Sequence, residues 1–557
     1  MVRQSSNRSS IVRVAFFGTV LTGVAILGGF GSANQAFAEE ASAPWVVPKA
    51  KCGPHDHPET GLQGQVAAPL RAAGFKGFNC NLELVSQQQI DGANWQSAEW
   101  RDRGHLGRGD GDRDGDDDDR GLAEGRRGRV CAYHGSASPS RSPPTRNPAH
   151  YGVPVVDVTD PDHLVTTGFL QTTSMLDPWE SLKVNERRQL LGADNGQNGG
   201  GGPEIDIYDL SQDCRFPQLL ASAPVGTGTD GGFVHKVTGH EGSWAPDGLT
   251  YYGGDLRAGQ YYAVDTTDPR RPKLITAWTV PIAKALSHGL SISEDGTRGY
   301  FSSLGNSGPA GIADPTVPAN NGLLIYDLSQ IQDRVPNPQV KLIGQLLWKD
   351  GSVAQHSIPI KIDGKRYLIF VDEGGSGGGT GTAQLAAACA AGVSPFPMAR
   401  IIDISDETNP KMVSRLGLET HDPKNCAQVV PDLVGLAIFT YGSHYCSVDD
   451  KHNATTLACG YFNSGIRVFD IRHPQRPKEI AYFNPAGVTV ASPGSNHPLF
   501  GQWVSGGPDW CSAQVHMNAS NGTLWSTCQD NGLLMLKFTN HVWPFDDTKT
   551  PAGSSEN

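Results

Sequence analysis

Three histidines recur at one position of a repeated sequence pattern. His240 lies in "GHEGSWAPDG" (239–248), His288 in "SHGLSISEDG" (287–296) and His356 in "QHSIPIKIDG" (355–364). Each histidine precedes the Asp of an Asp-Gly pair by seven residues, and an Asp-Gly pair between strand-like runs is typical of a tight β-hairpin turn. The equal spacing predicts that the three imidazoles begin equivalent strands of three successive repeats.

Imidazoles from separate strands are suitable ligands for a transition metal such as Fe, Cu or Zn. The predicted metal ligands are His240, His288, His356 and His444. Glu241 and Glu373 are the carboxylates expected to take part in catalysis or to orient the ligands. Two alternatives stay open: the histidines form hydrogen bonds between repeats, or the site binds a ligand without a metal.

Other polar residues begin or end strands on the same predicted face. They are assigned to substrate binding: Glu180, Gln428, Gln514, Asp255 and Asp530. Carboxylates on one face are also compatible with glycoside cleavage. The opposite face, which carries the Asp-Gly and Pro turns, is expected to show only turn chemistry. We found no nucleophile elbow, phosphate loop or dinucleotide fingerprint in the chain.

Each histidine hairpin is followed by a strand, a Pro-containing turn and another strand, as in "YYAVDTTDPRRPKLITAWTV" (261–280). Four antiparallel strands repeated in this way predict an all-β, seven-bladed β-propeller. The innermost strands are predicted to start near residues 80, 180, 240, 288, 356, 427 and 513. The seventh repeat ends at "GLLMLKF" (532–538) without a fourth strand, so the N-terminal segment "GLQGQVAA" (61–68) is expected to close the ring.

Three segments carry a family resemblance: "VVDVTDP" (155–161), "YAVDTTDPRRPK" (262–273) and "RVFDIRHPQRPK" (467–478). They resemble LVIVD-repeat proteins, which are exported bacterial β-propellers. The resemblance covers most of residues 60–540. It implies the fold and an exported protein, and it implies no single reaction.

Three segments are expected to lie outside the propeller domain, 39–545. Residues 1–38 combine Arg3, Arg8 and Arg13 with an apolar run and a small-residue cleavage site, which predicts a secretory signal peptide. The acidic insert 95–127 and the tail 546–557 are predicted to be disordered. Within the insert, three carboxylates match half of a calcium-loop pattern: Asp110, Asp112 and Asp114.

Composition narrows the partners and the compartment. A formal charge of -12 over 557 residues argues against nucleic acid, and no segment after the signal approaches the length of a membrane span. A small-molecule ligand or substrate is expected, in the periplasm or the medium. Ten cysteines in an exported chain indicate disulfides. The predicted pairs are Cys511–Cys528, Cys80–Cys131 and Cys446–Cys459.

Overall fold

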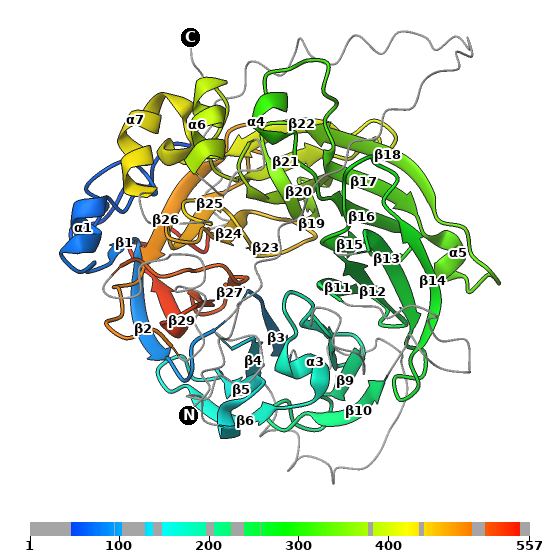
Figure 1. The fold of residues 1–557 in the computed structure, drawn as a ribbon. Helices are drawn as coiled ribbons and strands as arrows, with labels where there is room; N and C mark the ends of the chain where they lie inside the picture. Colours follow the sequence, from blue (N-terminus) through cyan, green and yellow to red (C-terminus); the bar gives the residue numbers. More distant parts are fainter. Residues whose placement is uncertain are drawn as a thin grey trace, which may run out of the picture. The chain divides into compact units, whose positions relative to one another are not determined.

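The computed structural model describes residues 46–93, 95–102, 128–136, 148–196, 205–223, 239–256, 258–376, 382–433, 439–492 and 507–545. These residues form seven antiparallel sheets arranged as the blades of a β-propeller, as predicted (Figure 1). The predicted signal peptide, the calcium pattern and the C-terminal tail lie outside the described residues.

The first three blades follow the chain in order, from the innermost to the outermost strand. The first blade contains β3 (Ser97–Arg101), β4 (Val130–His134), β5 (Val153–Asp157) and β6 (Val165–Leu170). The second contains β7 (Lys183–Asn185), β8 (Leu190–Asp194), β9 (Ile205–Asp209) and β10 (Gln218–Ala223). The third contains β11 (Glu241–Trp244), β12 (Thr250–Asp255), β13 (Gln260–Asp265) and β14 (Lys273–Thr279).

The next two blades repeat the same order. The fourth contains β15 (Leu290–Ile292), β16 (Arg298–Ser303), β17 (Asn321–Asp327) and β18 (Lys341–Trp348). The fifth contains β19 (Ser352–Ile362), β20 (Lys365–Gly374), β21 (Ala399–Asp403) and β22 (Lys411–Leu416).

The last two blades take strands from both ends of the chain. The sixth contains β23 (Cys446–Val448), β24 (Thr456–Gly460), β25 (Ile466–Asp470) and β26 (Lys478–Asn484), with β1 (Phe78–Cys80) as an additional outer strand. The seventh contains β27 (His516–Asn518), β28 (Thr523–Cys528), β29 (Gly532–Phe538) and, outermost, β2 (Leu82–Gln88). The N-terminal strand β2 therefore closes the ring against β29 (Figure 1).

Short helices connect the strands. They are α1 (Ala68–Ala72), α3 (Thr173–Leu176), α4 (Gly308–Gly311), α5 (Ser329–Gln332), α6 (Thr382–Ala390) and α7 (Cys426–Val429), with single 3-10 turns at Pro148–His150, Glu419–His421, Pro423–Asn425 and Val430–Leu433. Among the described residues, no helix is long and apolar enough to cross a bilayer.

The repeated turns explain the repeated sequence. Gly248, Gly296 and Gly364, which follow the Asp of each hairpin, have φ of 71°, 75° and 74°, a conformation that glycine adopts without strain. At the other turn, the Asp that ends the third strand accepts a hydrogen bond from the amide two residues later. Asp157 and Thr159 (3.0 Å) and Asp265 and Thr267 (2.9 Å) are examples. These side chains shape the turn locally, so the motif recurs wherever the turn does.

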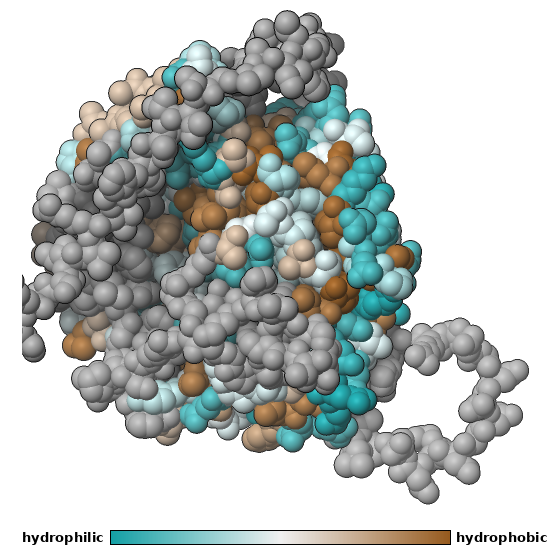
Figure 2. Space-filling view, turned by 45° about the vertical axis from the view of Figure 1, so that its right-hand side comes forward, coloured by the Kyte–Doolittle hydropathy of each residue, from teal (hydrophilic) through white to brown (hydrophobic). Residues whose placement is uncertain are grey.

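The outermost strands carry charge on their exposed edge. An exposed lysine begins three of them, Lys273, Lys341 and Lys411, and another, Lys478, begins β26, which β1 covers in part. Charged residues of this kind discourage sheet edges from pairing with other chains. Figure 2 shows hydrophilic residues along the right-hand edge of the molecule and hydrophobic residues toward the middle of the visible face.

Three strand predictions were wrong. The ring is closed by Leu82–Gln88 rather than by residues 61–68, and the innermost strand of the first blade is β3 rather than a strand near residue 80. Residues 61–67 instead form a loop, in which Gly64 accepts a hydrogen bond from Ser464 (2.7 Å). The innermost strand of the sixth blade is β23 rather than a strand near residue 427, where the chain forms α7.

Disorder was predicted from residue 95 onward, but this start is too early, because β3 lies within the insert. Trp95 and Trp100 are buried, and burying two tryptophans stabilises a strand that the charged composition of the segment argues against. Residues 103–127 lie outside the described part of the chain.

Five disulfides join all ten cysteines. Cys511–Cys528 and Cys446–Cys459 confirm two predicted pairs, each between neighbouring strands of one blade or their ends. The predicted pair Cys80–Cys131 is wrong, because Cys80 ends β1 of the sixth blade and Cys131 lies in β4 of the first blade. The remaining pairs are Cys52–Cys80, Cys131–Cys214 and Cys389–Cys426.

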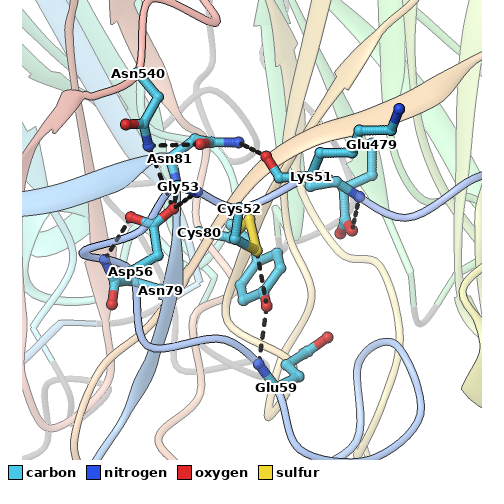
Figure 3. The surroundings of a disulfide bond; sticks show 12 residues. Lys51, Cys52, Gly53, Asp56, Glu59, Asn79, Cys80, Asn81, Glu479 and Asn540 are labelled. Atoms are coloured by element: carbon cyan, nitrogen blue, oxygen red, sulfur yellow. Dashed lines mark hydrogen bonds between the residues drawn. A yellow bond between two sulfur atoms is a disulfide. The ribbon is translucent and has the colours of Figure 1, made fainter.

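The Cys52–Cys80 disulfide ties the N-terminal segment to β1, next to the closing strand (Figure 3). Beside it, Asp56 accepts hydrogen bonds from the amides of Gly53 (2.7 Å) and Asn81 (2.9 Å). The covalent bond and the Asp56 contacts hold the start of the propeller in place.

Candidate metal centre

Five ionisable residues from five blades meet where the innermost strands begin. Glu180, His240, His288 and His444 precede β7, β11, β15 and β23, and Glu373 lies near the end of β20. We call these five residues the His/Glu cluster. Because the start of an innermost strand and the end of the next strand share one face of a blade, the propeller brings them together on one side of its central channel.

The cluster is tightly packed. Glu180 Oε1 lies 3.0 Å from His444 Nε2, while Glu180 Oε2 lies 3.3 Å from His240 Nε2 and 3.4 Å from His288 Nε2. Glu373 Oε1 lies 3.5 Å from His288 Nε2, and Glu373 Oε2 lies 3.1 Å from His444 Nε2. Each carboxylate therefore faces imidazoles with both of its oxygens.

Backbone carbonyls orient two of the imidazoles. His288 Nδ1 lies 3.1 Å from the carbonyl oxygen of Gln355, and His444 Nδ1 lies 2.8 Å from that of Ser512. A carbonyl only accepts hydrogen bonds, so both Nδ1 atoms carry a proton and donate it. The Nε2 atoms are left facing the carboxylates, which is the ring orientation found in metal-bound histidines.

Two atoms of the cluster have no hydrogen-bond partner among the described residues. They are Glu180 Oε2 and His444 Nε2, and both side chains are buried. They lie close to opposite charges without the alignment of a hydrogen bond. Buried polar atoms are usually hydrogen-bonded, so these two atoms are candidate donors for a further group.

Electrostatics couple the cluster strongly. Burial would raise the pKa of Glu180, but the neighbouring His240, His444 and His288 hold it well below its ordinary value. Burial would lower the pKa of both His288 and His444, but the surrounding carboxylates raise the pKa of His288 to about 9 and that of His444 to about 10. Without a bound ion, the imidazolium groups balance the carboxylates.

The donor atoms form two groups that could each hold a metal ion. Glu180, His240 and His288 make one group, and Glu180, Glu373 and His444 make the other; within each group the donor atoms all lie within 4.8 Å of one another. A third group, Cys52, Asp56 and Cys80, is not a candidate, because its two cysteines form a disulfide.

An aromatic shell covers the cluster. The ring centre of Trp95 lies 5.4 Å from that of His444, Phe462 lies 5.1 Å from His444, and Trp179 lies 5.6 Å from His240. Trp510 packs against Trp95 at 5.6 Å. These rings exclude water, which strengthens the electrostatic interactions beneath them.

Solvent reaches the cluster most readily at His240. Its side chain is 16% exposed, whereas the side chains of His288 and His444 are 1% exposed or less. His240, which lies beside Trp179, is therefore the most accessible imidazole of the cluster.

The carboxylate of Glu241, predicted to be catalytic, lies next to the cluster. Glu241 Oε2 is 3.7 Å from His288 Nδ1, and Glu241 Oε1 is 3.9 Å from Lys183 Nζ. Burial raises the pKa of Glu241. Glu241 lies on the Nδ1 side of the His288 ring, so it is placed to orient this candidate ligand. Sequence reasoning missed Lys183, Gln355 and the aromatic Trp95.

His356 does not join the other histidines, although it lies at the equivalent distance from its turn. Its ring stacks on Tyr445 at 4.6 Å between ring centres, its Nε2 accepts a hydrogen bond from the amide of Cys446 (3.4 Å), and Nδ1 contacts Gln355. β19 begins early, with Val353 at φ 54° and a register shift between Ala354 and His356. For His356, the structure agrees with the alternative in which the histidine forms a hydrogen bond to the next blade.

The remaining predicted site residues have structural partners. Gln514 Oε1 accepts from the amide of Ser97 (2.9 Å), Asp255 from that of Ala258 (3.1 Å) and Asp530 from that of Ser492 (2.7 Å). Gln428 is exposed on α7, because the innermost strand of the sixth blade begins at Cys446 rather than near residue 427. Of the five residues predicted to bind substrate, the structure brings only Glu180 into the cluster.

A cavity of about 2070 Å³ opens on the opposite, turn-bearing face, which the sequence predicted to show only turn chemistry. Residues of all seven innermost strands line it, including Lys183, Ser243, Ser291, Lys361 and His516. Lys183 thus lies between the cavity and Glu241. Burial lowers the pKa of Lys183, although Glu241 and Glu180 oppose this effect.

Comparisons with known proteins found only distant similarity to solved structures. No family model and no curated protein matches the chain, so the resemblance to LVIVD-repeat proteins stays a prediction. A candidate 6-phosphogluconolactonase from Bacteroides uniformis is 11% identical with a TM-score of 0.44, covering 71% of this chain and 90% of that one. Hydrazine synthase from Kuenenia stuttgartiensis is 10% identical with a TM-score of 0.42, covering 73% and 91%. A periplasmic gluconolactonase from Pseudomonas aeruginosa is 12% identical with a TM-score of 0.37, covering 65% and 84%. Similarities of this size carry no argument about the chemistry of the chain.

Proposed function

We propose that the protein is an exported, metal-dependent oxidoreductase that acts on a small molecule at the His/Glu cluster. The observation that carries the proposal is the group formed by Glu180, His240 and His288, whose donor atoms all lie within 4.8 Å of one another. Two imidazoles and one carboxylate are the ligand set of non-haem iron oxygenases, in which the remaining positions of the metal stay open.

The surroundings suit such a site. Backbone carbonyls orient His288 and His444, and the aromatic shell of Trp95, Trp179 and Phe462 limits access by water. A metal bound there would supply an open position at which an oxidant or substrate is activated. Glu241 orients His288, and the exposed edge of His240 admits the small molecule.

The proposed reaction is a two-electron oxidation with dioxygen as the oxidant. The substrate loses two electrons and two protons, and dioxygen gains both to give hydrogen peroxide. Export is part of the proposal, because five disulfides are typical of proteins in oxidising compartments.

A binding function without catalysis is the second candidate, and the cavity on the turn face favours it. Ligand sites in propellers are concave and lined by a few convergent polar groups, and this cavity presents Lys183, Ser243 and Ser291. On this alternative a ligand would occupy the cavity, and removal of metal would leave its binding unchanged.

Elemental analysis of protein purified without a polyhistidine tag tests the main proposal. We expect at least about one equivalent of Fe, Cu or Zn, which is lost in the His240→Ala and His288→Ala variants. His356→Ala is the matched control, because His356 is buried like His288 and lies outside the His/Glu cluster. Circular dichroism would confirm that each variant is folded.

The reaction itself is tested by peroxide formation. Protein loaded with Fe or Cu should produce peroxide from a panel of small alcohols, thiols and amines, whereas zinc-loaded protein, whose ion has no redox chemistry, and the His240→Ala variant should not. Metal below about 0.1 equivalent, with no uptake from Fe, Cu or Zn solutions, would overturn the proposal. Bound metal with turnover of hydrolytic substrates and no peroxide would overturn its redox part.

A further inference from the structure

We propose that the His/Glu cluster holds two adjacent cations, with the second bound by His444, Glu373 and the Oε1 oxygen of Glu180. This inference rests on the proposed function, which needs one metal at Glu180, His240 and His288. It assigns a second ion to the donor group on the other side of Glu180.

The two oxygens of Glu180 face in different directions. Oε2 faces His240 (3.3 Å) and His288 (3.4 Å), whereas Oε1 faces His444 (3.0 Å). One ion beside the first two imidazoles would use one oxygen and leave the other for an ion beside His444. A carboxylate in this position bridges two cations.

Glu373 repeats the arrangement from the fifth blade. Its Oε1 lies 3.5 Å from His288 Nε2 and its Oε2 lies 3.1 Å from His444 Nε2. Two carboxylates from different blades thus span the same two imidazoles. Two-metal sites hold their ions roughly 3.5–4 Å apart, a separation that a bridging carboxylate spans.

The second position has a donor that is buried and not hydrogen-bonded among the described residues. His444 is fully buried, its Nδ1 donates to the Ser512 carbonyl, and its Nε2 lacks an aligned partner. With Nδ1 protonated, a neutral His444 would point a lone pair at two carboxylates. A cation between the three groups satisfies all of them.

The charge of the surrounding side chains favours two bound metal ions over an uncharged bound group. Glu180, Glu373 and the adjacent Glu241 can supply three negative charges within a buried site. A buried metal ion is stabilised by negatively charged side chains of this kind. Two divalent ions with one bound hydroxide would be balanced by these three carboxylates.

Zinc and manganese are the probes for the test. Metal-free protein, prepared with a chelator and desalted after loading, should bind two Zn²⁺ per chain. His444→Ala and Glu373→Gln should each retain one, and His356→Ala should retain two. Crystals soaked in Mn²⁺ should show two anomalous peaks, one beside His288 and one beside His444.

The outcomes separate the two proposals. No bound metal would overturn both the second site and the proposed function. One ion in the unmodified protein, or two in the His444→Ala variant, would overturn the second site and leave the proposed function standing. If His444→Ala fails to fold, Glu373→Gln and the anomalous peaks decide the question.

Discussion

His444 Nε2 lies 3.0 Å from Glu180 Oε1, although His444 precedes the sixth blade and Glu180 the second. The two residues meet because the innermost strands of a propeller all begin around one axis, so residues of non-adjacent blades become neighbours there. This contact joins the two donor groups of the His/Glu cluster and makes Glu180 its centre.

Glu180→Gln should therefore remove metal from the whole cluster. We expect the affinity for Zn²⁺ to fall by more than about 100-fold, since even changes beside metal ligands cost 10- to 100-fold. Competition with a chromophoric chelator measures the loss. Glu83→Gln, which changes an exposed carboxylate on β2, is the control and should keep the original affinity; a similar loss in both variants would contradict the central role of Glu180.

Ring closure through β2 predicts unequal effects of two leucines on one strand. Leu82 is fully buried and Leu84 is 44% exposed. Leu82→Ala should lower the free energy of unfolding by about 2–4 kcal/mol, because it leaves a cavity between the sixth and seventh blades. Leu84→Ala should change it by less than about 0.5 kcal/mol. Urea denaturation measures both, and equal effects would show that β2 does not close the ring in solution.

The Cys52–Cys80 disulfide should protect the start of the domain. Its cysteines are 28 residues apart, and replacing both with serine should cost about 3–4 kcal/mol by the loop-entropy relation. The N-terminal segment should also become sensitive to limited proteolysis. Replacing Cys389 and Cys426, which are 37 residues apart, should lower stability similarly while the N-terminal segment stays protected.

His421 predicts a pH dependence of stability. Burial lowers the pKa of His421 to about 3, although the hydrogen bond between Nε2 and the carbonyl of Tyr441 (3.0 Å) opposes this effect. Below pH 6.5 the unfolded chain binds this proton and the folded chain does not. The contribution of His421 to the free energy of unfolding is therefore complete above pH 6.5 and decreases as pH falls toward 3. Between pH 6 and 4.5 it decreases by about 2 kcal/mol.

Unfolding free energies at pH 6 and 4.5 test this sign. The His421→Gln variant should lose less stability across the interval than the unmodified protein, by about 2 kcal/mol. His452→Gln, a change at an exposed histidine, should leave the dependence as it was. A steeper dependence in His421→Gln would contradict the assignment.

Local patterns in the sequence were enough to predict the blades. Asp-Gly hairpins and Asp-containing turns are short-range features, and their spacing identified strands such as β12 and β16 together with the number of blades. The disulfide Cys511–Cys528 was predictable for the same reason, since its cysteines flank one hairpin.

The tertiary structure decided which equivalent positions share a site. His240, His288 and His356 have the same spacing from their turns, yet a register shift in β19 and the stacking on Tyr445 direct His356 away. Glu180, predicted to bind substrate, became the centre of the cluster. The direction of a side chain at the propeller axis depends on neighbours from other blades, and the sequence of one repeat carries no information about them. The same holds for β2, whose partner β29 lies at the other end of the chain.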